Sequence, residues 1–93
     1  MKNKNMKSLF LVLLLGLMVS NVQAAVTCKA YPQSEWANQD DLKQVLIEEG
    51  YTIKTLKIEN NCYEMYGKNK QNKKVEIYFD MKLLAIVAAE IEK

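Results

Sequence analysis

Several residue types that catalytic sites commonly need are missing or scarce in this chain. The 93 residues include no histidine, only three glycines, one proline and two cysteines. Without histidine, neither a Ser–His–Asp nor a Cys–His arrangement can form, and two widely spaced cysteines cannot complete a usual zinc site. No glycine-rich phosphate loop and no Cys-x-x-Cys motif occurs either. The usual routes to nucleophilic, zinc-dependent and dithiol-redox chemistry are therefore closed.

Paired carboxylates are the remaining catalytic candidates. They occur at Asp40/Asp41, Glu48/Glu49 and Glu90/Glu92. Glycosidase-type work needs two carboxylates in one cleft with separated pKa values, and a chain this short rarely builds such a cleft. The first two pairs also fall at the ends of a predicted helix, where solvated charge is the ordinary explanation. We therefore predict no enzymatic activity, no catalytic residue, no metal and no cofactor.

The first 24 residues have the pattern of a secretory signal peptide. Lys2, Lys4 and Lys7 precede an apolar run over residues 8–19, and Val22-Gln23-Ala24 offers a cleavage site. A membrane anchor is the alternative, but the run is too short for a span that needs roughly 20 residues. We expect cleavage after Ala24, a single domain over 25–93 in the periplasm or outside a bacterial cell, and no membrane insertion after cleavage.

Charge argues against nucleic acid as a partner. All 13 basic residues are lysines, and three of them leave with the signal peptide, so the 11 acids outnumber the remaining lysines by one. A chain without excess positive charge has no electrostatic attraction to nucleic acid or to an anionic membrane surface.

Both cysteines, Cys28 and Cys62, lie in the part expected to be exported. A domain of this size has a marginal core and often needs a covalent staple, and an oxidising compartment favours a disulfide. A metal pair or a redox dithiol is the alternative, and the lack of histidine and of Cys-x-x-Cys disfavours both. We predict a structural Cys28–Cys62 disulfide.

The remaining sequence predicts one helix and then about four antiparallel strands. Asn38 is a good N-cap for a helix over 38–49, Leu42, Val45 and Leu46 give it one apolar stripe, and Gly50 ends it. Strands are expected at 51–59 (with a bulge near 54–55), 62–67, 75–80 and 83–91, with turns at 60–61 and at 72. Alanines in 83–91 favour helix, but its β-branched residues and the short link before it favour a strand. The fold class is α+β, with the helix packed on one sheet face.

Period-two alternation sorts the second and third strands into two faces. Val75, Ile77 and Phe79 form an apolar face, whereas acids and tyrosines form the other. A solvated outer face explains the second set, and a recognition surface explains it as well. A tryptophan ahead of the helix is either a core anchor or an aromatic contact for a partner. The candidate partner-binding residues are Trp36, Glu64, Tyr66, Glu76 and Tyr78.

Several blocks occur in an order that resembles the PepSY domain, in its small secreted single-domain version. They are Glu35-Trp36, Glu48-Glu49-Gly50-Tyr51-Thr52-Ile53-Lys54, Asn61-Cys62-Tyr63-Glu64-Met65-Tyr66-Gly67 and Lys73-Lys74-Val75-Glu76-Ile77-Tyr78-Phe79-Asp80. The resemblance covers about residues 28–91. The chain departs from the family pattern in two turns, at Gln71-Asn72 and at Met81-Lys82-Leu83-Leu84.

The resemblance implies a helix on an antiparallel sheet, export and no enzymatic activity. It also implies a protein partner, and so a binding module that inhibits or otherwise modulates a peptidase or another envelope protein. The alternative is a small-molecule or redox-linked accessory or sensor beside a membrane partner such as a cytochrome. The pull-down of a peptidase would favour the first hypothesis, and binding of haem or a metabolite the second.

Overall fold

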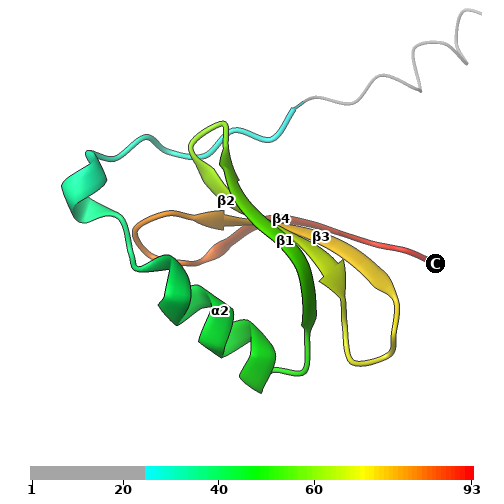
Figure 1. The fold of residues 1–93 in the computed structure, drawn as a ribbon. Helices are drawn as coiled ribbons and strands as arrows, with labels where there is room; N and C mark the ends of the chain where they lie inside the picture. The colour runs from blue at the N-terminus through cyan, green and yellow to red at the C-terminus, as the bar shows by residue number, and fades with distance from the viewer. Residues whose placement is uncertain (1–24) are drawn as a thin grey trace, which may run out of the picture.

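The computed structural model describes residues 25–93, which form one α-helix and one sheet (Figure 1). The predicted signal peptide lies outside the described residues. The elements are a 3₁₀ turn η1 (Gln33–Glu35), helix α2 (Gln39–Glu48) and strands β1 (Thr52–Glu59), β2 (Cys62–Lys68), β3 (Lys74–Asp80) and β4 (Ile86–Ile91). Neighbouring strands are antiparallel and follow the order β1-β2-β3-β4, so the sheet is a meander. The predicted α+β fold is confirmed.

Local hydrogen bonds stabilise both ends of α2, at the capping residues that the sequence predicts. The Asn38 side chain accepts a hydrogen bond from the Asp40 N–H at 2.7 Å, which satisfies one of the free donors of the first turn. At the other end Gly50 takes φ +93°, and the Tyr51 N–H donates to the Leu46 carbonyl at 2.9 Å. That bond is one of the two in a Schellman ending, as predicted.

The apolar stripe of α2 is narrower than the sequence predicts. Leu42 and Leu46 are buried, but Val45 is 49% exposed. Residues at i and i+4 stack on one helix face, whereas i+3 falls to one side of it. With the sheet on a single side of the helix, Val45 lies at the margin of the contact. The expectation that all three residues pack inward is therefore wrong for Val45.

The β1–β2 hairpin has the predicted turn and the predicted bulge. Asn60 and Asn61 both take positive φ, at 51° and 65°, as a two-residue hairpin turn requires. The strand register shifts between Ile53 and Thr55. Opposite this shift lies Gly67, where an added Cβ would collide with the Thr52 carbonyl oxygen. The bulge and the glycine therefore belong together, because the backbone of β1 approaches β2 too closely for any side chain.

The chain enters β4 later than the sequence predicts. The Asp80 carboxylate accepts hydrogen bonds from the N–H groups of Lys82 (3.1 Å) and Leu83 (2.7 Å), and Leu84 takes φ 59°. These interactions hold the link in a turn, so the strand begins at Ile86 rather than at Leu83. The choice of strand over helix for this segment is confirmed.

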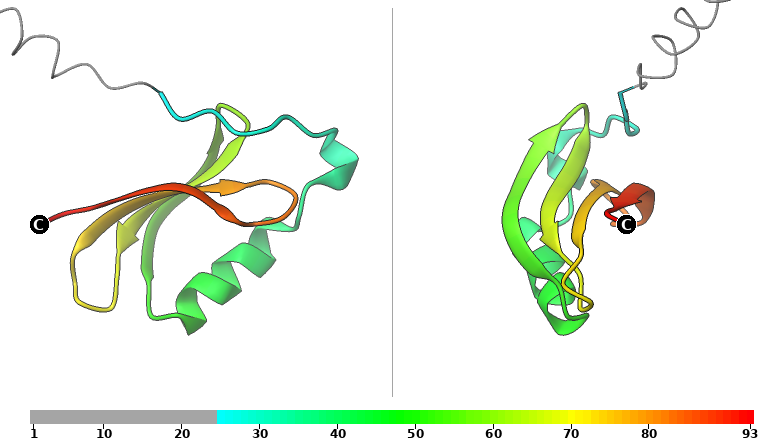
Figure 2. Two further views of the ribbon diagram at one scale, coloured as in Figure 1. Left: turned by 180° about the vertical axis from the view of Figure 1, so that it is seen from behind. Right: turned by 90° about the vertical axis from the view of Figure 1, so that its right-hand side faces the viewer.

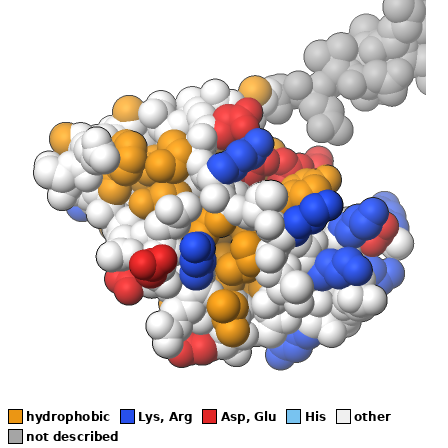
Figure 3. Space-filling model, in the orientation of Figure 1, with side chains coloured by type: hydrophobic (Ala, Val, Ile, Leu, Met, Phe, Trp, Pro, Cys, Tyr) orange, Lys and Arg blue, Asp and Glu red, His pale blue; other side chains and the backbone are white. Residues whose placement is uncertain are grey.

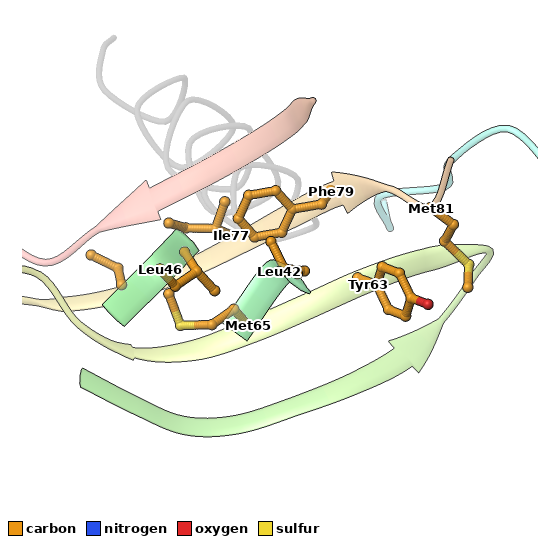
Figure 4. Packing of buried hydrophobic residues seen from close by; sticks show 8 residues of the cluster. Leu42, Leu46, Tyr63, Met65, Ile77, Phe79 and Met81 are labelled. Carbon is orange, nitrogen blue, oxygen red and sulfur yellow. The ribbon is translucent and has the colours of Figure 1, made fainter. Parts of the chain in front are cut away.

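The core lies between α2 and one face of the sheet. Leu42 and Leu46 point from the helix toward Met65 and Ile77 (Figure 4). Tyr63 and Met81 lie toward one end of the cluster. The Tyr63 hydroxyl, although its ring is buried, donates a hydrogen bond of 2.7 Å to the Ala37 carbonyl. That bond keeps the phenol paired, as a buried polar group must be.

A disulfide fastens the N-terminal segment to the opposite face of the sheet. Cys28 and Cys62 are bonded, with their Cα atoms 5.2 Å apart, as the sequence predicts. The Cys28 N–H also donates to the Asn60 carbonyl at 3.0 Å. Further along, the Tyr31 hydroxyl donates to Asp80 at 2.9 Å. The segment thus crosses the end of the sheet on the face that α2 leaves free.

Candidate partner-binding surface

The sheet face opposite α2 carries two rows of cross-strand neighbours. One row runs Thr55, Tyr66, Glu76, Glu90 and the other runs Lys57, Glu64, Tyr78, Ala88. Residues that pair directly across a sheet project to the same side. We call these eight residues the acidic face. Four of the five predicted partner-binding residues lie together on it, because the register of β2 against β3 puts acids beside tyrosines.

Glu64 and Glu76 lie on the neighbouring strands β2 and β3, and each carboxyl group shifts the pKa of the other. A hydrogen bond between the two carboxyl groups, which can form only when one of them is protonated, is the largest cause of both pKa shifts. The Tyr78 hydroxyl donates to Glu76 Oε2 at 2.8 Å, and Lys57 Nζ lies 3.9 Å from Glu64 Oε1. The Tyr78 hydrogen bond favours the ionised form of Glu76. Lys57 acts against this by favouring ionised Glu64, but the higher pKa of the two remains that of Glu64.

The pKa values of the pair move apart as a result. The hydrogen bond with Glu76 raises the pKa of Glu64 to about 7, and burial and the charge of Glu76 add to the rise. The hydrogen bond with Glu64 lowers the pKa of Glu76, with help from the Tyr78 hydroxyl. Burial raises the pKa of Tyr78, so its hydroxyl stays a donor.

Part of the acidic face is buried, unlike a sheet face that is fully exposed to solvent. Glu64 is only 6% exposed, whereas Tyr66 is 46% exposed. The expectation of a solvated face is thus met by Tyr66 and not by Glu64. Because Glu64 is held by a neighbour on each side, a partner would meet Tyr66, Glu76 and Glu90 before it reached Glu64.

Two shallow hollows share Glu76 and Glu90 in their linings. One hollow of about 400 Å³ is also lined by Tyr66, Lys74 and Glu92. The other, of about 430 Å³, is bordered by Tyr78 and Ala88, and by Ala25 and Val26 of the N-terminal segment. Glu76 and Glu90 are direct cross-strand partners, and like charges in that position repel. The centre of this surface therefore carries negative charge that favours a cation.

The edge strand β4 presents apolar side chains that sequence reasoning did not single out. Ile86 and Ile91 are 60% and 59% exposed, and Val87 is about half exposed. Helix α2 lies nearest to β1, at the opposite side of the sheet, as the end-on view in Figure 2 shows. The apolar pattern of β4 was visible in the sequence. Only the position of the helix, which the pattern does not give, shows that these side chains stay uncovered.

Charge is also unevenly spread on the face that carries α2. Figure 3 shows hydrophobic side chains that reach the surface, with lysines gathered toward the side of the β2–β3 turn. That turn contains Lys70 and Lys73. Lys70 and Lys73 therefore lie at the hairpin tip, whereas Lys74 lines one hollow beside Glu76 and Glu90, and Lys57 is the basic member of the acidic face itself.

Trp36, the fifth predicted partner-binding residue, lies apart from the other four. Its ring packs against the core cluster, and its Nε1–H donates to the Tyr31 carbonyl at 3.0 Å. A tryptophan with both its ring and its N–H occupied anchors the turn that precedes α2. The structure places it on the helix side of the domain, away from the acidic face.

The described residues hold few other chemical options. Over residues 25–93, no three histidine, cysteine, aspartate or glutamate side chains come together as a metal site would need. Within the same range, no helix has the length and hydropathy of a membrane span.

Comparison with known proteins gives one match. Searches of curated proteins and of solved structures found none. A family model described as peptidase propeptide and YPEB domain matches residues 8–90, which is nearly the whole chain. The resemblance seen in the Gly-Tyr, Cys-Tyr-Glu and Val-Glu-Ile-Tyr-Phe-Asp blocks is thereby confirmed. The chain belongs to the PepSY family of peptidase propeptide and YPEB domains.

Proposed function

We propose that this protein is a non-catalytic, exported PepSY module that binds and modulates a peptidase or another envelope protein. The observation that carries the proposal is family membership over nearly the whole chain, in a family described by peptidase propeptides. A propeptide acts on its enzyme by contact, so a single domain of this kind needs a surface and no reaction centre of its own.

The composition of the surface supports binding over catalysis. The sequence has no histidine, and the most perturbed carboxyl pair, Glu64 and Glu76, is occupied by its mutual hydrogen bond. In contrast, β4 offers an exposed strand edge with apolar side chains. Strand edges bind extended segments through main-chain hydrogen bonds, and protein partners use this mode repeatedly.

Export is supported by two independent features. The first 24 residues have the pattern of a signal peptide, and the only two cysteines form a disulfide. Disulfides persist in oxidising compartments and are rare in the cytosol. A partner in the cell envelope or outside the cell follows from that location.

The test is capture and inhibition with the disulfide-bonded chain of residues 25–93. Immobilised protein is incubated with envelope and secreted fractions of the producing cells, and the captured peptidases are assayed with and without added protein. We expect a peptidase or envelope protein to be retained at micromolar bait and its rate to change. A disulfide-stapled domain of similar size and unrelated fold is the control. Retention of nothing beyond that control would overturn the proposal.

A further inference from the structure

We propose that β4 receives an extended segment of the partner as a fifth strand, and that this segment alternates apolar residues with Lys or Arg. The inference rests on the proposed function that the protein acts by binding. It adds which edge is used and what chemistry the bound segment has. Each element of the inference follows from the register and the exposure of β4.

The free main-chain groups of β4 belong to Ala89 and Ile91. Within residues 25–93, β4 pairs with β3 alone and ends the sheet. The Glu92 N–H donates to the Lys74 carbonyl at 2.9 Å. Because hydrogen-bonded pairs alternate along an antiparallel ladder, Glu90 and Glu92 turn their main-chain groups toward β3. Ala89 and Ile91 then turn theirs outward, where an added strand could pair with them.

Side chains opposite Ala89 and Ile91 would lie on the helix side of the sheet. There they would meet Ile91, which is 59% exposed, and the uncovered border of the core. Helix α2 lies nearest to β1 and leaves this border open. Apolar side chains of a bound segment would extend the core over this gap, which removes apolar surface from water.

Side chains opposite Glu90 would lie on the other side, over the acidic face. Glu76 and Glu90 repel each other across β3 and β4, and both line the two hollows there. A Lys or Arg side chain placed beside Glu90 would relieve that repulsion. The exposed ring of Tyr66 lines the same surface and suits a cation. Lys74 lines one of the hollows, but three glutamates outnumber it there, and the other hollow has Glu76 and Glu90 and no lysine. Charge complementarity therefore favours a basic residue at this position.

A second copy of this chain fits the edge less well. A two-fold pairing of β4 with β4 joins two acidic faces into one continuous surface, so it doubles the negative charge around Glu90. A helical segment cannot satisfy the outward N–H and C=O groups of Ala89 and Ile91. A basic, extended segment can pair with these main-chain groups and also offset the negative charge around Glu90.

The experiment uses two heptapeptides and the ¹⁵N-labelled, disulfide-bonded chain of residues 25–93. One peptide alternates Val and Lys, and the matched peptide alternates Val and Glu. We expect the lysine peptide to slow amide exchange at Ala89 and Ile91 at least tenfold. Its affinity should exceed that of the glutamate peptide by at least tenfold, since like charges against an acidic surface suppress wrong partners.

Two variants test the mode of pairing. Ala89→Pro removes an outward N–H and spares the ladder with β3, a position where an edge strand tolerates proline, so it should abolish binding and keep the fold. Glu90→Lys should reverse the preference toward the glutamate peptide. Glu49→Lys is the matched control, because it makes the same charge change at an exposed site at the end of α2. It should leave the preference as it is.

Several outcomes overturn the inference. They are equal binding of both peptides, protection of β1 in place of β4, no protection at millimolar peptide, and a concentration-dependent dimer that protects the same amides. If the peptides fail while a peptidase is still captured, this inference falls and the proposed function stands. If the lysine peptide binds β4 but no envelope protein is captured, the proposed function falls and the binding edge remains.

Discussion

The two edges of the sheet are built in opposite ways. β1 carries a bulge between Ile53 and Thr55, has two lysines in the middle of its length, and lies beside α2. β4 lacks lysine and exposes isoleucines at both of its ends. Bulges, lysines and a covering helix are the devices by which proteins protect a strand edge from unwanted pairing. The edge at β1 is therefore protected against pairing with another strand, whereas the edge at β4 is not.

The contrast suggests a division of labour along the sheet. The β1–β2 side holds the disulfide, the close glycine approach and most of the contact with the helix. Changes on this side should cost stability. Changes at β4 should cost recognition and leave stability nearly intact. The following tests, from the largest expected effect to the smallest, can break or sharpen that distinction.

Removal of the disulfide should have the largest effect. The bond closes a span of 34 residues, for which the chain-entropy model gives about 3–4 kcal/mol. We expect the Cys28→Ser, Cys62→Ser double variant to lose about that much free energy of unfolding in a urea titration. Reductant should then shift the unfolding midpoint of the parent chain and leave the double variant unaffected. Equal midpoints for the parent chain and the double variant would mean that the disulfide does not stabilise the β1–β2 side of the sheet.

Truncation in the core should come next. Met65 is 0% exposed and lies on β2 under α2, so Met65→Ala should cost about 3 kcal/mol through lost burial and a cavity. Ile86→Ala removes an apolar side chain that is 60% exposed. That matched change at β4 should cost below about 0.5 kcal/mol. Similar losses in the free energy of unfolding of the two variants, measured in urea, would show that the two sides of the sheet do not differ in this way.

A methyl group added at Gly67, where the β1 backbone comes close to β2, should have a somewhat smaller effect. In Gly67→Ala, the new Cβ would meet the Thr52 carbonyl oxygen, and the bulged part of β1 would have to move away. We expect a loss of about 2 kcal/mol, as for other overpacked sites. Tyr66→Phe, one residue earlier and facing the other side, should stay within about 0.5 kcal/mol. Thermal unfolding of both variants would show whether the approach of β1 to Gly67 leaves no room for a side chain.

The proton shared by Glu64 and Glu76 should give the smallest stability effect, seen through pH. The pKa of Glu64 is raised to about 7 from an ordinary value of 4.5. Between those values the folded chain holds a proton that the unfolded chain releases. The contribution of Glu64 is thus full below pH 4.5 and is lost as pH rises through 7, whereas the lowered pKa of Glu76 gives a contribution that is lost as pH falls below 4.5.

The variant Glu64→Gln isolates this effect. A neutral amide can still donate to Glu76 and has no proton to lose. Relative to this variant, the parent chain should lose about 1 kcal/mol between pH 6 and pH 8. Glu49→Gln, the same change at an exposed acid at the end of α2, serves as the control. Parallel stability curves for parent and Glu64→Gln would contradict a shared proton.

Most of the fold could be predicted because its boundaries are set locally. Asn38 and Gly50 define the helix by their own backbone preferences, and Asn60, Asn61 and Asn72 all take the positive φ that asparagine tolerates. The bulge in β1 could also be predicted, since its apolar residues alternate in two incompatible registers. Each of these signals acts over a few residues and needs no knowledge of the rest of the molecule.

The misplaced features depend on contacts between distant residues. β4 begins at Ile86 because Asp80 holds the turn before it, and Asp80 is itself held by Tyr31. The burial of Glu64 and its proton sharing depend on the register between β2 and β3. Val45 is exposed because the helix lies over one side of the sheet. Patterns along the chain do not contain these relations.

The disulfide has a consequence for the way this molecule would carry tension. A pull on the N-terminal end passes through the bond from Cys28 directly to Cys62 at the start of β2. The segment between the two cysteines, with the whole of α2 and β1, would bear no load. A molecule fully stretched from its two ends would extend about 110 Å less than a reduced one, because each residue of the closed ring spans roughly 3.4 Å when extended and the bonded Cα atoms are already 5.2 Å apart.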